Sequence, residues 1–222
     1  MNHLHCKLNE EFFDSQTPTS AYVLGWIYSD GTLRKNRYQI KIVSNDIEVL
    51  EKIKNLMSTN HKIYKTLRKN RSKPTYSLVL DSKHLYQQLI KIGLTPNKSK
   101  TLSFPILLQK VMPYFIRGYF EGDGCIWHDN FPIKGKLFKR IRASFTSGSY
   151  SMLLGLREFL VKKIGLSNCK IRTQHINHGY DISWSNKDTQ KLFKYIYKDN
   201  LDMCLKRKYE KFNLYNQFTR NK

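Results

Sequence analysis

Acidic residues are scarce in this chain of 222 residues. Only 17 Asp and Glu stand against 39 Lys and Arg, and the resulting formal net charge of +22 is spread along the whole length. Lys and Arg neutralise the phosphates of nucleic acids in a sequence-independent and salt-dependent way. The charge therefore predicts a polyanionic partner, with ribosome association or a membrane-surface role as the alternatives to direct nucleic-acid binding.

Cysteines are few, and long apolar runs are missing. Cys6, Cys125, Cys169 and Cys204 form no close C-x-x-C pair, which argues against a zinc site and against a secreted disulfide framework. No segment approaches the ~20 apolar residues that span a bilayer, and the first residues lack the basic and apolar regions of a signal peptide. We therefore expect reduced thiols in an intracellular protein of the host cytoplasm or an organelle matrix, with no membrane partner.

Apolar and aromatic residues are abundant enough for a packed core. Hydrophobic residues make up 40% of the chain and aromatic residues 13%, unlike a disordered basic tail. The length suits one large domain or two fused small ones.

The chain divides into two halves that repeat one another in the same order. Both halves contain the pattern apolar-x-Gly-aromatic-apolar-x-small-Asp-Gly, and shorter echoes follow it. The matching segments are 20–31 with 113–124, 62–66 with 170–174, and 97–101 with 205–209. A duplicated domain explains this order better than chance does.

The first half predicts helix, two strands, helix, two strands, helix. Pro18 suits a first helical position after Thr17, and Gly31 suits a left-handed helix cap. The later elements are a strand over 37–43 with Tyr38, Ile40 and Ile42 on its apolar face, a helix with apolar residues at Ile47, Leu50, Ile53 and Met57, strands over 61–68 and 75–80, and a helix marked by Leu85, Leu89 and Ile92.

The second half repeats this order, with a longer loop expected in its first hairpin. Its strands alternate around Ile141–Phe145 and Tyr180–Trp184, and its helices carry Leu153, Leu156 and Leu160, then Leu192, Phe193 and Ile196. We predict an α+β fold of two pseudo-symmetric αββαββα lobes, each with a four-stranded antiparallel sheet. The expected divisions are an N-terminal extension (1–16), a first lobe (17–100), a linker (101–112) and a second lobe (113–222).

The repeated motif resembles a known family. Both Val23–Gly31 and Ile116–Gly124 are similar to the LAGLIDADG nonapeptide of homing endonucleases, and they open the two halves of a basic chain. The resemblance implies the monomeric two-motif form, whose motif helices pack at the lobe interface. It also implies metal-dependent cutting of both strands of a long asymmetric DNA site, with short 3′ overhangs.

The motif residues also make physical sense in themselves. Gly25 and Gly118 would let two helix backbones pack closely, which offsets the cost of glycine in a helix. Asp30 and Asp123 fall in the last helical turn, so parallel helices would bring two carboxylates together. A divalent cation relieves that repulsion, and Mg²⁺ prefers such oxygen ligands, with Mn²⁺ or Ca²⁺ as substitutes in binding. Gly31 and Gly124 complete the predicted metal site.

Two features complicate this interpretation of the motif. Each Asp-Gly pair is also an ordinary way to end a helix, although a matched pair of them favours a site. Tyr28 and Glu121 occupy the sixth motif position, and Arg117 replaces a small residue. Glu121 is thus a second carboxylate that competes for the metal assignment.

Lysines at matching positions are candidates for the scissile phosphates. The resemblance implies a basic residue after the last strand of each half, where Lys98 and Lys206 lie in echoing segments. Such a lysine stabilises the charge that develops on the phosphate. Lys100 and Lys208 are the neighbours that would hold the role instead, and most lysines in so basic a chain are simply solvated.

The polar faces of the predicted strands are candidates for DNA contacts. Arg and Gln read guanine and adenine edges in the major groove, although each of these residues also fits a merely solvated face. The predicted DNA-binding residues are Arg37, Gln39, Lys41, Lys62, Tyr64, Thr66 and Arg68 in the first half, and Arg140, Arg142, Ser144, Lys170, Arg172 and Gln174 in the second.

The sequence leaves three functions open. The first is a site-specific endonuclease of intron homing that acts on double-stranded DNA. The second is an RNA maturase that helps a host intron to fold, and the third is a non-catalytic DNA-binding protein on the same fold. Intact aspartates favour the first, and no additional helical DNA-binding domain of the kind expected for the third is visible in the sequence.

Overall fold

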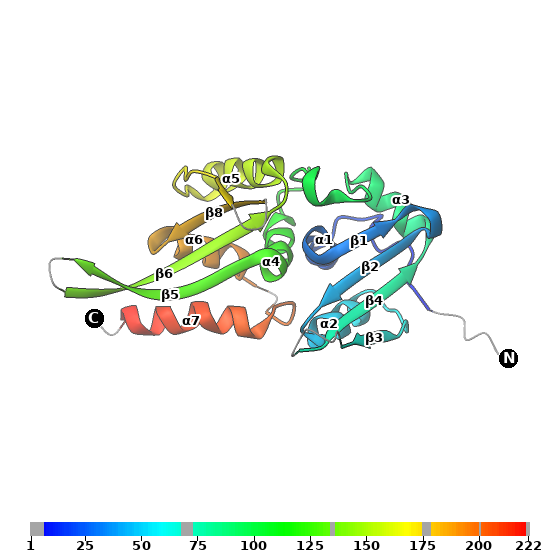
Figure 1. Cartoon of the computed structure of the whole chain (residues 1–222), viewed down its shortest axis with the longest axis horizontal. Coiled ribbons are helices and arrows are strands. Elements are labelled where there is room, and N and C mark those ends of the chain that lie inside the picture. Colours follow the sequence, from blue (N-terminus) through cyan, green and yellow to red (C-terminus); the bar gives the residue numbers. More distant parts are fainter. Residues whose placement is uncertain (1–6, 68–72, 134–135, 175–178, 200, 221–222) are drawn as a thin grey trace.

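The computed structural model describes residues 7–67, 73–133, 136–174, 179–199 and 201–220. It forms two lobes that lie side by side, with one helix of each lobe at the centre (Figure 1). The elements of the first lobe are α1 (Pro18–Asp30), β1 (Gly31–Arg34), the 3₁₀ turn η1 (Lys35–Arg37), β2 (Gln39–Ser44), α2 (Ile47–Leu56), β3 (Ile63–Thr66), β4 (Thr75–Asp81), α3 (Lys83–Lys91) and η2 (Lys98–Lys100). Those of the second are α4 (Met112–Asp123), β5 (Gly124–Ile133), β6 (Lys136–Ser147), α5 (Tyr150–Ile164), β7 (Arg172–Gln174), β8 (Gly179–Ser185), α6 (Lys187–Ile196) and α7 (Lys206–Arg220).

Each lobe contains a four-stranded antiparallel sheet. The strand orders are β1-β2-β4-β3 and β5-β6-β8-β7, so the two sheets have the same topology. This confirms the predicted α+β class and the repeated αββαββα plan.

The start of α1 follows its sequence closely. Thr17 caps the helix, since its side chain accepts from the Ser20 amide and the Ser20 hydroxyl accepts from the Thr17 amide, both at 3.0 Å. The end differs from the prediction, because Gly31 is extended (φ −85°, ψ 150°) and passes directly into β1. Glycine is needed there for space, because a Cβ would lie 2.5 Å from the Ile27 carbonyl oxygen.

The predicted strand over 37–43 begins two residues too early. Arg37 lies in η1, and Tyr38 takes a left-handed conformation (φ 46°) before β2 begins at Gln39. Tyr38 is 42% exposed and packs edge-on against Tyr86, so it is not part of the apolar face. The tight hairpin needs this reversal of the chain. The alternation of apolar and polar residues continues through the turn, so the sequence pattern does not mark where the strand begins.

The sequence predicts a longer loop in the first hairpin of the second half. This prediction is wrong, because those residues extend the two strands of the hairpin. β5 and β6 are 10 and 12 residues long, whereas β1 and β2 are 4 and 6. Helix α7, which the sequence pattern does not predict, runs beside β5 (Figure 1). His128 Nε2 donates to the Lys211 carbonyl oxygen at 2.8 Å, and Phe212 is buried, so α7 braces the long hairpin.

The core lies between each sheet and its helices. Ile40, Ile42, Leu78 and Leu80 are fully buried in the first lobe, and Ala143, Phe145 and Ile182 are fully buried in the second. The opposite faces of both sheets are left for polar side chains. Among the described residues, no helix combines the length and apolar character that crossing a membrane requires.

Candidate active site and nucleic-acid interface

Helices α1 and α4 touch backbone to backbone at the lobe interface. A Cβ on Gly25 would lie 2.3 Å from the Phe115 carbonyl oxygen, and one on Gly118 would lie 2.1 Å from the Tyr22 carbonyl oxygen. Real Cβ atoms do not come so close, so only glycine permits this approach. The glycines therefore set the distance between the lobes.

The close packing brings the C-terminal ends of the two helices together. Asp30 ends α1 and Asp123 ends α4. Gly122 lies against the first helix, since a Cβ there would be 1.9 Å from Ser29 Oγ and 2.6 Å from Asp30 Oδ2. Both aspartates are partly buried, so two carboxylates share one small site.

The site penalises the ionised form of both carboxylates. Burial is the main cause that raises the pKa of Asp123 to about 7, and the charge of Asp30 raises it further. Burial likewise raises the pKa of Asp30, against the opposing effects of Ser29, Lys98 and Lys208. A site of this kind favours a bound cation.

Two buried lysines cap the ends of these helices. Lys98 Nζ donates to the carbonyl oxygens of Tyr28 and, at 3.2 Å, of Ser29. Lys208 Nζ donates to the carbonyl oxygens of Phe120 at 2.7 Å, Glu121 at 2.6 Å and Gly124. The carbonyls of Tyr28, Ser29, Phe120 and Glu121 lie in the last turns of α1 and α4, so the lysines supply positive charge at the negative end of each helix dipole.

Lys208, and not Lys206, is the structural counterpart of Lys98. Lys206 is exposed, whereas Lys98 and Lys208 are 7% and 5% exposed. The matched sequences Asn97–Thr101 and Leu205–Tyr209 aligned Lys98 with Lys206, two residues too early. The reason is geometric, because the side chain that reaches the helix end is fixed by the turn into α7. Lys100 is exposed, like Lys206.

A cleft beside Asp123 is built from both lobes. Its volume is about 280 Å³, and Lys98 from the first lobe lines it together with Asp123, Thr146 and Gln174 from the second. The Thr146 hydroxyl donates to the Asp123 carbonyl oxygen at 2.9 Å and fixes the start of β5. The cleft therefore joins a carboxylate and an ammonium that come from opposite lobes.

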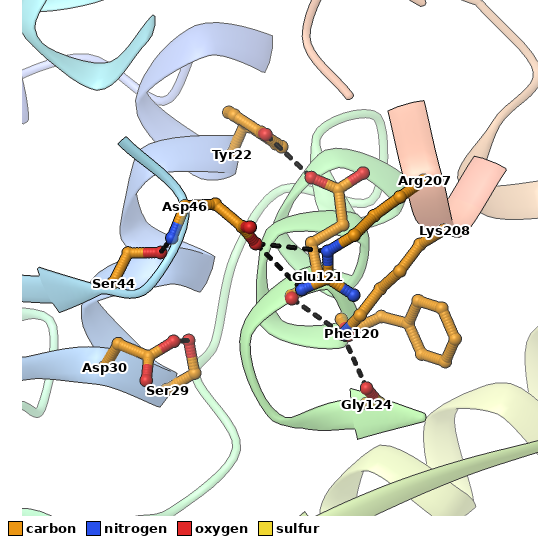
Figure 2. Close-up of polar contacts among 10 residues, drawn as sticks. All are labelled: Tyr22, Ser29, Asp30, Ser44, Asp46, Phe120, Glu121, Gly124, Arg207 and Lys208. Atoms are coloured by element: carbon orange, nitrogen blue, oxygen red, sulfur yellow. Dashed lines mark hydrogen bonds and ion pairs between the residues drawn. The ribbon is translucent and has the colours of Figure 1, made fainter. Parts of the chain in front are cut away.

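Glu121 does not compete with the aspartates. It is 1% exposed and accepts hydrogen bonds from Tyr22 Oη at 2.7 Å and Tyr197 Oη at 3.0 Å. Figure 2 shows its carboxylate directed toward Tyr22 and away from Asp30. Glu121 thus belongs to the interior of the lobe interface.

The two motif-ending glycines are closely packed at the ends of their helices. Gly31 is enclosed by Ile27, and Gly124 by Phe120. The carbonyl oxygen of Gly124 accepts from the Lys208 ammonium, which disfavours a cation at the same oxygen. The predicted contribution of Gly124 to a metal site conflicts with this contact.

The donor set fits an open magnesium site. Magnesium is commonly held by one or two carboxylates, with water and phosphate oxygens completing its shell. Within the described part of the chain, no group of three or more His, Cys, Asp or Glu side chains forms a closed metal site. Asp30 and Asp123 could supply two carboxylates to such a site, with its remaining positions open to water and phosphate oxygens.

The outer face of the first sheet carries most of the residues expected there. Strand register places Gln39 opposite Asp81, and Lys41 opposite Val79, while Tyr64 and Thr66 continue the same face on β3. Gln39 is 8% exposed, and its Nε2 donates to Asp81 Oδ1 at 2.8 Å. Gln39, Lys62 and Tyr64 line one groove with Asp81. Arg37 lies in the hairpin turn instead, and Arg68 is outside the described residues.

The outer face of the second sheet presents paired arginines. Arg140 binds Asp129 through two hydrogen bonds of 2.8 and 2.6 Å, and this pair lowers the pKa of Asp129. Arg172 binds Asp181 at 2.9 Å, and Arg142 lies over the Trp127 ring. Register places Ser144 and Gln174 on the same face, and the exposed Lys170 precedes β7.

Sequence reasoning missed several residues of these faces. Arg34 donates to Gln39 at 3.4 Å, and Asp81, Asp129 and Asp181 each hold a predicted DNA-binding side chain. The positions of these residues in the alternating pattern of each strand indicate that they lie on the outer face. A pattern of basic residues does not by itself indicate their acidic partners.

Comparisons with known proteins agree with this architecture. Residues 17–93 match the family of LAGLIDADG-like domains, and no curated protein sequence matches the chain. The fold is similar to the I-LtrWI LAGLIDADG homing endonuclease bound to target DNA (TM-score 0.61, 15% identity, covering 96% of this chain and 92% of that chain). It is also similar to the LAGLIDADG meganuclease I-AabMI bound to uncleaved DNA (TM-score 0.59, 12% identity, covering 92% of each chain). A further similar structure is the LAGLIDADG homing endonuclease I-SmaMI bound to cleaved DNA (TM-score 0.56, 15% identity, covering 82% of each chain).

The fold and the paired helix ends define a two-lobed α+β protein of the LAGLIDADG type. Residues 17–93 form a LAGLIDADG-like domain, and the fold over both lobes is that of LAGLIDADG homing endonucleases.

Proposed function

We propose that the chain is a site-specific endonuclease that cuts both strands of double-stranded DNA. The single observation that carries this proposal is the meeting of Asp30 and Asp123 at abutting helix ends, each flanked by a buried lysine. The fold alone would support DNA binding. The paired carboxylates add a site that suits phosphodiester hydrolysis.

Each group in the site has a defined task in this proposal. Asp30 and Asp123 would hold Mg²⁺, which would supply Lewis-acid activation of a water and positive charge for the leaving oxygen. Lys98 and Lys208 bring positive charge to the scissile phosphates and stabilise the charge that develops on them. Both lysines are held by backbone carbonyls, so this charge is already oriented before DNA arrives.

DNA would lie across the outer faces of the two sheets. The long β5–β6 hairpin extends the second face, and the interface between the lobes would sit at the cut. Because the two faces differ in sequence, the target would be long and asymmetric. Short 3′ overhangs and a monomeric state belong to the same proposal.

A cleavage selection tests the function on duplexes of every sequence at once. A randomised duplex library is incubated with the protein and Mg²⁺, and cut molecules are captured by ligation and sequenced. The expected result is one enriched sequence with a fixed cut position on both strands. Specific binding without any cut product would support a non-catalytic DNA-binding protein, and retention of intron RNA alone would support a maturase.

A further inference from the structure

The segments that lead from α3 to Lys98 and from α6 to Lys208, here called connectors, differ in length. Lys98 lies six residues after Ile92, the C-terminal cap of α3, and Lys208 lies twelve residues after Ile196, the last residue of α6. A longer tether has more conformational freedom to lose, so it needs more contacts to hold its end in place.

The first-lobe connector receives a hydrogen bond from its motif helix. Tyr28 Oη donates to the Ile92 carbonyl oxygen at 3.4 Å. Tyr28 is the sixth residue of the first motif, and Lys98 follows a short distance beyond Ile92.

The second-lobe connector is held at several points by Arg117. This side chain is fully buried, and its guanidinium donates to the carbonyl oxygens of Ile196, Asp199 (2.7 Å) and Met203 (3.2 Å). The Ile196 carbonyl corresponds to that of Ile92, so both motif helices hold the same point with different residues. The rings of Tyr114 and Tyr197 lie 5.3 Å from the guanidinium carbon.

Glu121 holds the same connector from one turn further along α4. It accepts from Tyr197 Oη at 3.0 Å, and the backbone amide of Leu205, near the end of the connector, acts to lower the pKa of its carboxyl against the effect of burial. It also accepts from Tyr22 of α1 at 2.7 Å, which ties the cluster to the first lobe. Lys208 follows Leu205 by three residues and reaches the α4 carbonyls, as Figure 2 shows.

We propose that Arg117 and Glu121 are positioning residues that hold the long connector so that Lys208 stays at the end of α4. Arg117, which replaces a small residue of the motif, and Glu121 thus take the place of the contact made by Tyr28 in the first lobe. The consequence for DNA cutting rests on the proposed function, whereas the consequence for Lys208 itself does not.

Amine labelling tests the placement of Lys208 without DNA. The folded protein is treated with a trace amine reagent, and modification of Lys208 is compared with that of Lys98 by mass spectrometry. Tyr197→Phe removes one hydrogen bond to Glu121 at little cost in packing. Glu121→Gln removes the carboxylate itself and weakens the hydrogen bonds from both Tyr22 and Tyr197. We expect Lys208 labelling to rise by about tenfold in Glu121→Gln and by less in Tyr197→Phe, with Lys98 unchanged.

Tyr195→Phe is the matched control. Tyr195 lies on α6, two residues before Tyr197, and its buried hydroxyl has no hydrogen-bond partner among the described residues. Its removal should leave both lysines at wild-type labelling. Unchanged Lys208 labelling in folded Tyr197→Phe and Glu121→Gln would overturn the proposal, as would an equal rise at Lys98 and Lys208.

Strand-resolved cleavage tests the consequence for the reaction. On a target that the wild type cuts, Glu121→Gln should slow one strand about tenfold more than the other and accumulate nicked plasmid. Equal slowing of both strands would indicate a general loss of structure and would contradict the positioning role. A wild type that cuts no DNA would refute the proposed function, while the labelling result would still decide the placement of Lys208.

Discussion

Asp30 and Asp123 occupy the helix end that least favours a negative charge. The last turn of a helix exposes carbonyl oxygens, so a carboxylate there meets repulsion from the dipole as well as from its neighbour. Lys98 and Lys208 offset this by binding those carbonyls. The same two lysines therefore stabilise the helix ends and supply charge to the site.

Replacing Lys208 should cost far more stability than replacing Lys206. Lys208→Ala leaves three carbonyl oxygens without their ammonium donor, which predicts a loss of roughly 1–3 kcal/mol. Lys206→Ala changes an exposed side chain and should stay within about 0.5 kcal/mol of wild type. Urea denaturation of both variants measures the difference. Equal midpoints would contradict the assignment of Lys208 as the counterpart of Lys98.

At the scale of elements, the contact between α1 and α4 determines the site. Gly118→Ala would place a Cβ 2.1 Å from the Tyr22 carbonyl oxygen, and the helices would have to separate. The expected loss is at least ~3 kcal/mol, together with lower solubility of the separated lobes. Thermal unfolding and size-exclusion chromatography detect both effects. A wild-type melting temperature would show that the helices are not in close contact.

In the proposed function, the two sheet faces recognise the bases. Gln39→Ala and Arg142→Ala should each change the bases tolerated at particular positions of one half-site, at a cost of roughly 1–3 kcal/mol for the matched base. Lys162→Ala, on the exposed surface of α5, is the control for loss of charge alone. Profiling a randomised target library distinguishes the cases. A uniform loss at all positions would make Gln39 and Arg142 phosphate contacts.

The elements that the sequence predicted are those with a repeated pattern. The motif helices, their glycines and aspartates recur at a spacing of 93 residues, and the apolar faces of β2, β6 and β8 alternate. Helix α7 was missed because its sequence is largely polar and its place is set by packing against β5. Lys206 was chosen over Lys208 for a related reason, since contacts made by Arg117 and Glu121 determine where the connector ends.

At the scale of the whole molecule, the charge of +22 predicts that association with DNA is driven by phosphate neutralisation. Log affinity should fall linearly with log salt concentration, with a slope of about −4 or steeper if about five phosphates are neutralised. Fluorescence anisotropy on one duplex across a salt series measures the slope. A slope near zero would exclude the outer sheet faces as a DNA-binding surface.

The most direct measurement compares cutting with binding in Asp30→Asn and Asp123→Asn. Each substitution preserves size and removes one charge from the shared site. With Mg²⁺ and a target selected by the wild type, cleavage of plasmid DNA should collapse in both variants. DNA binding should survive, and should tighten without metal because a carboxylate no longer repels the scissile phosphate. Undiminished cutting by either folded variant would contradict a site built on both aspartates.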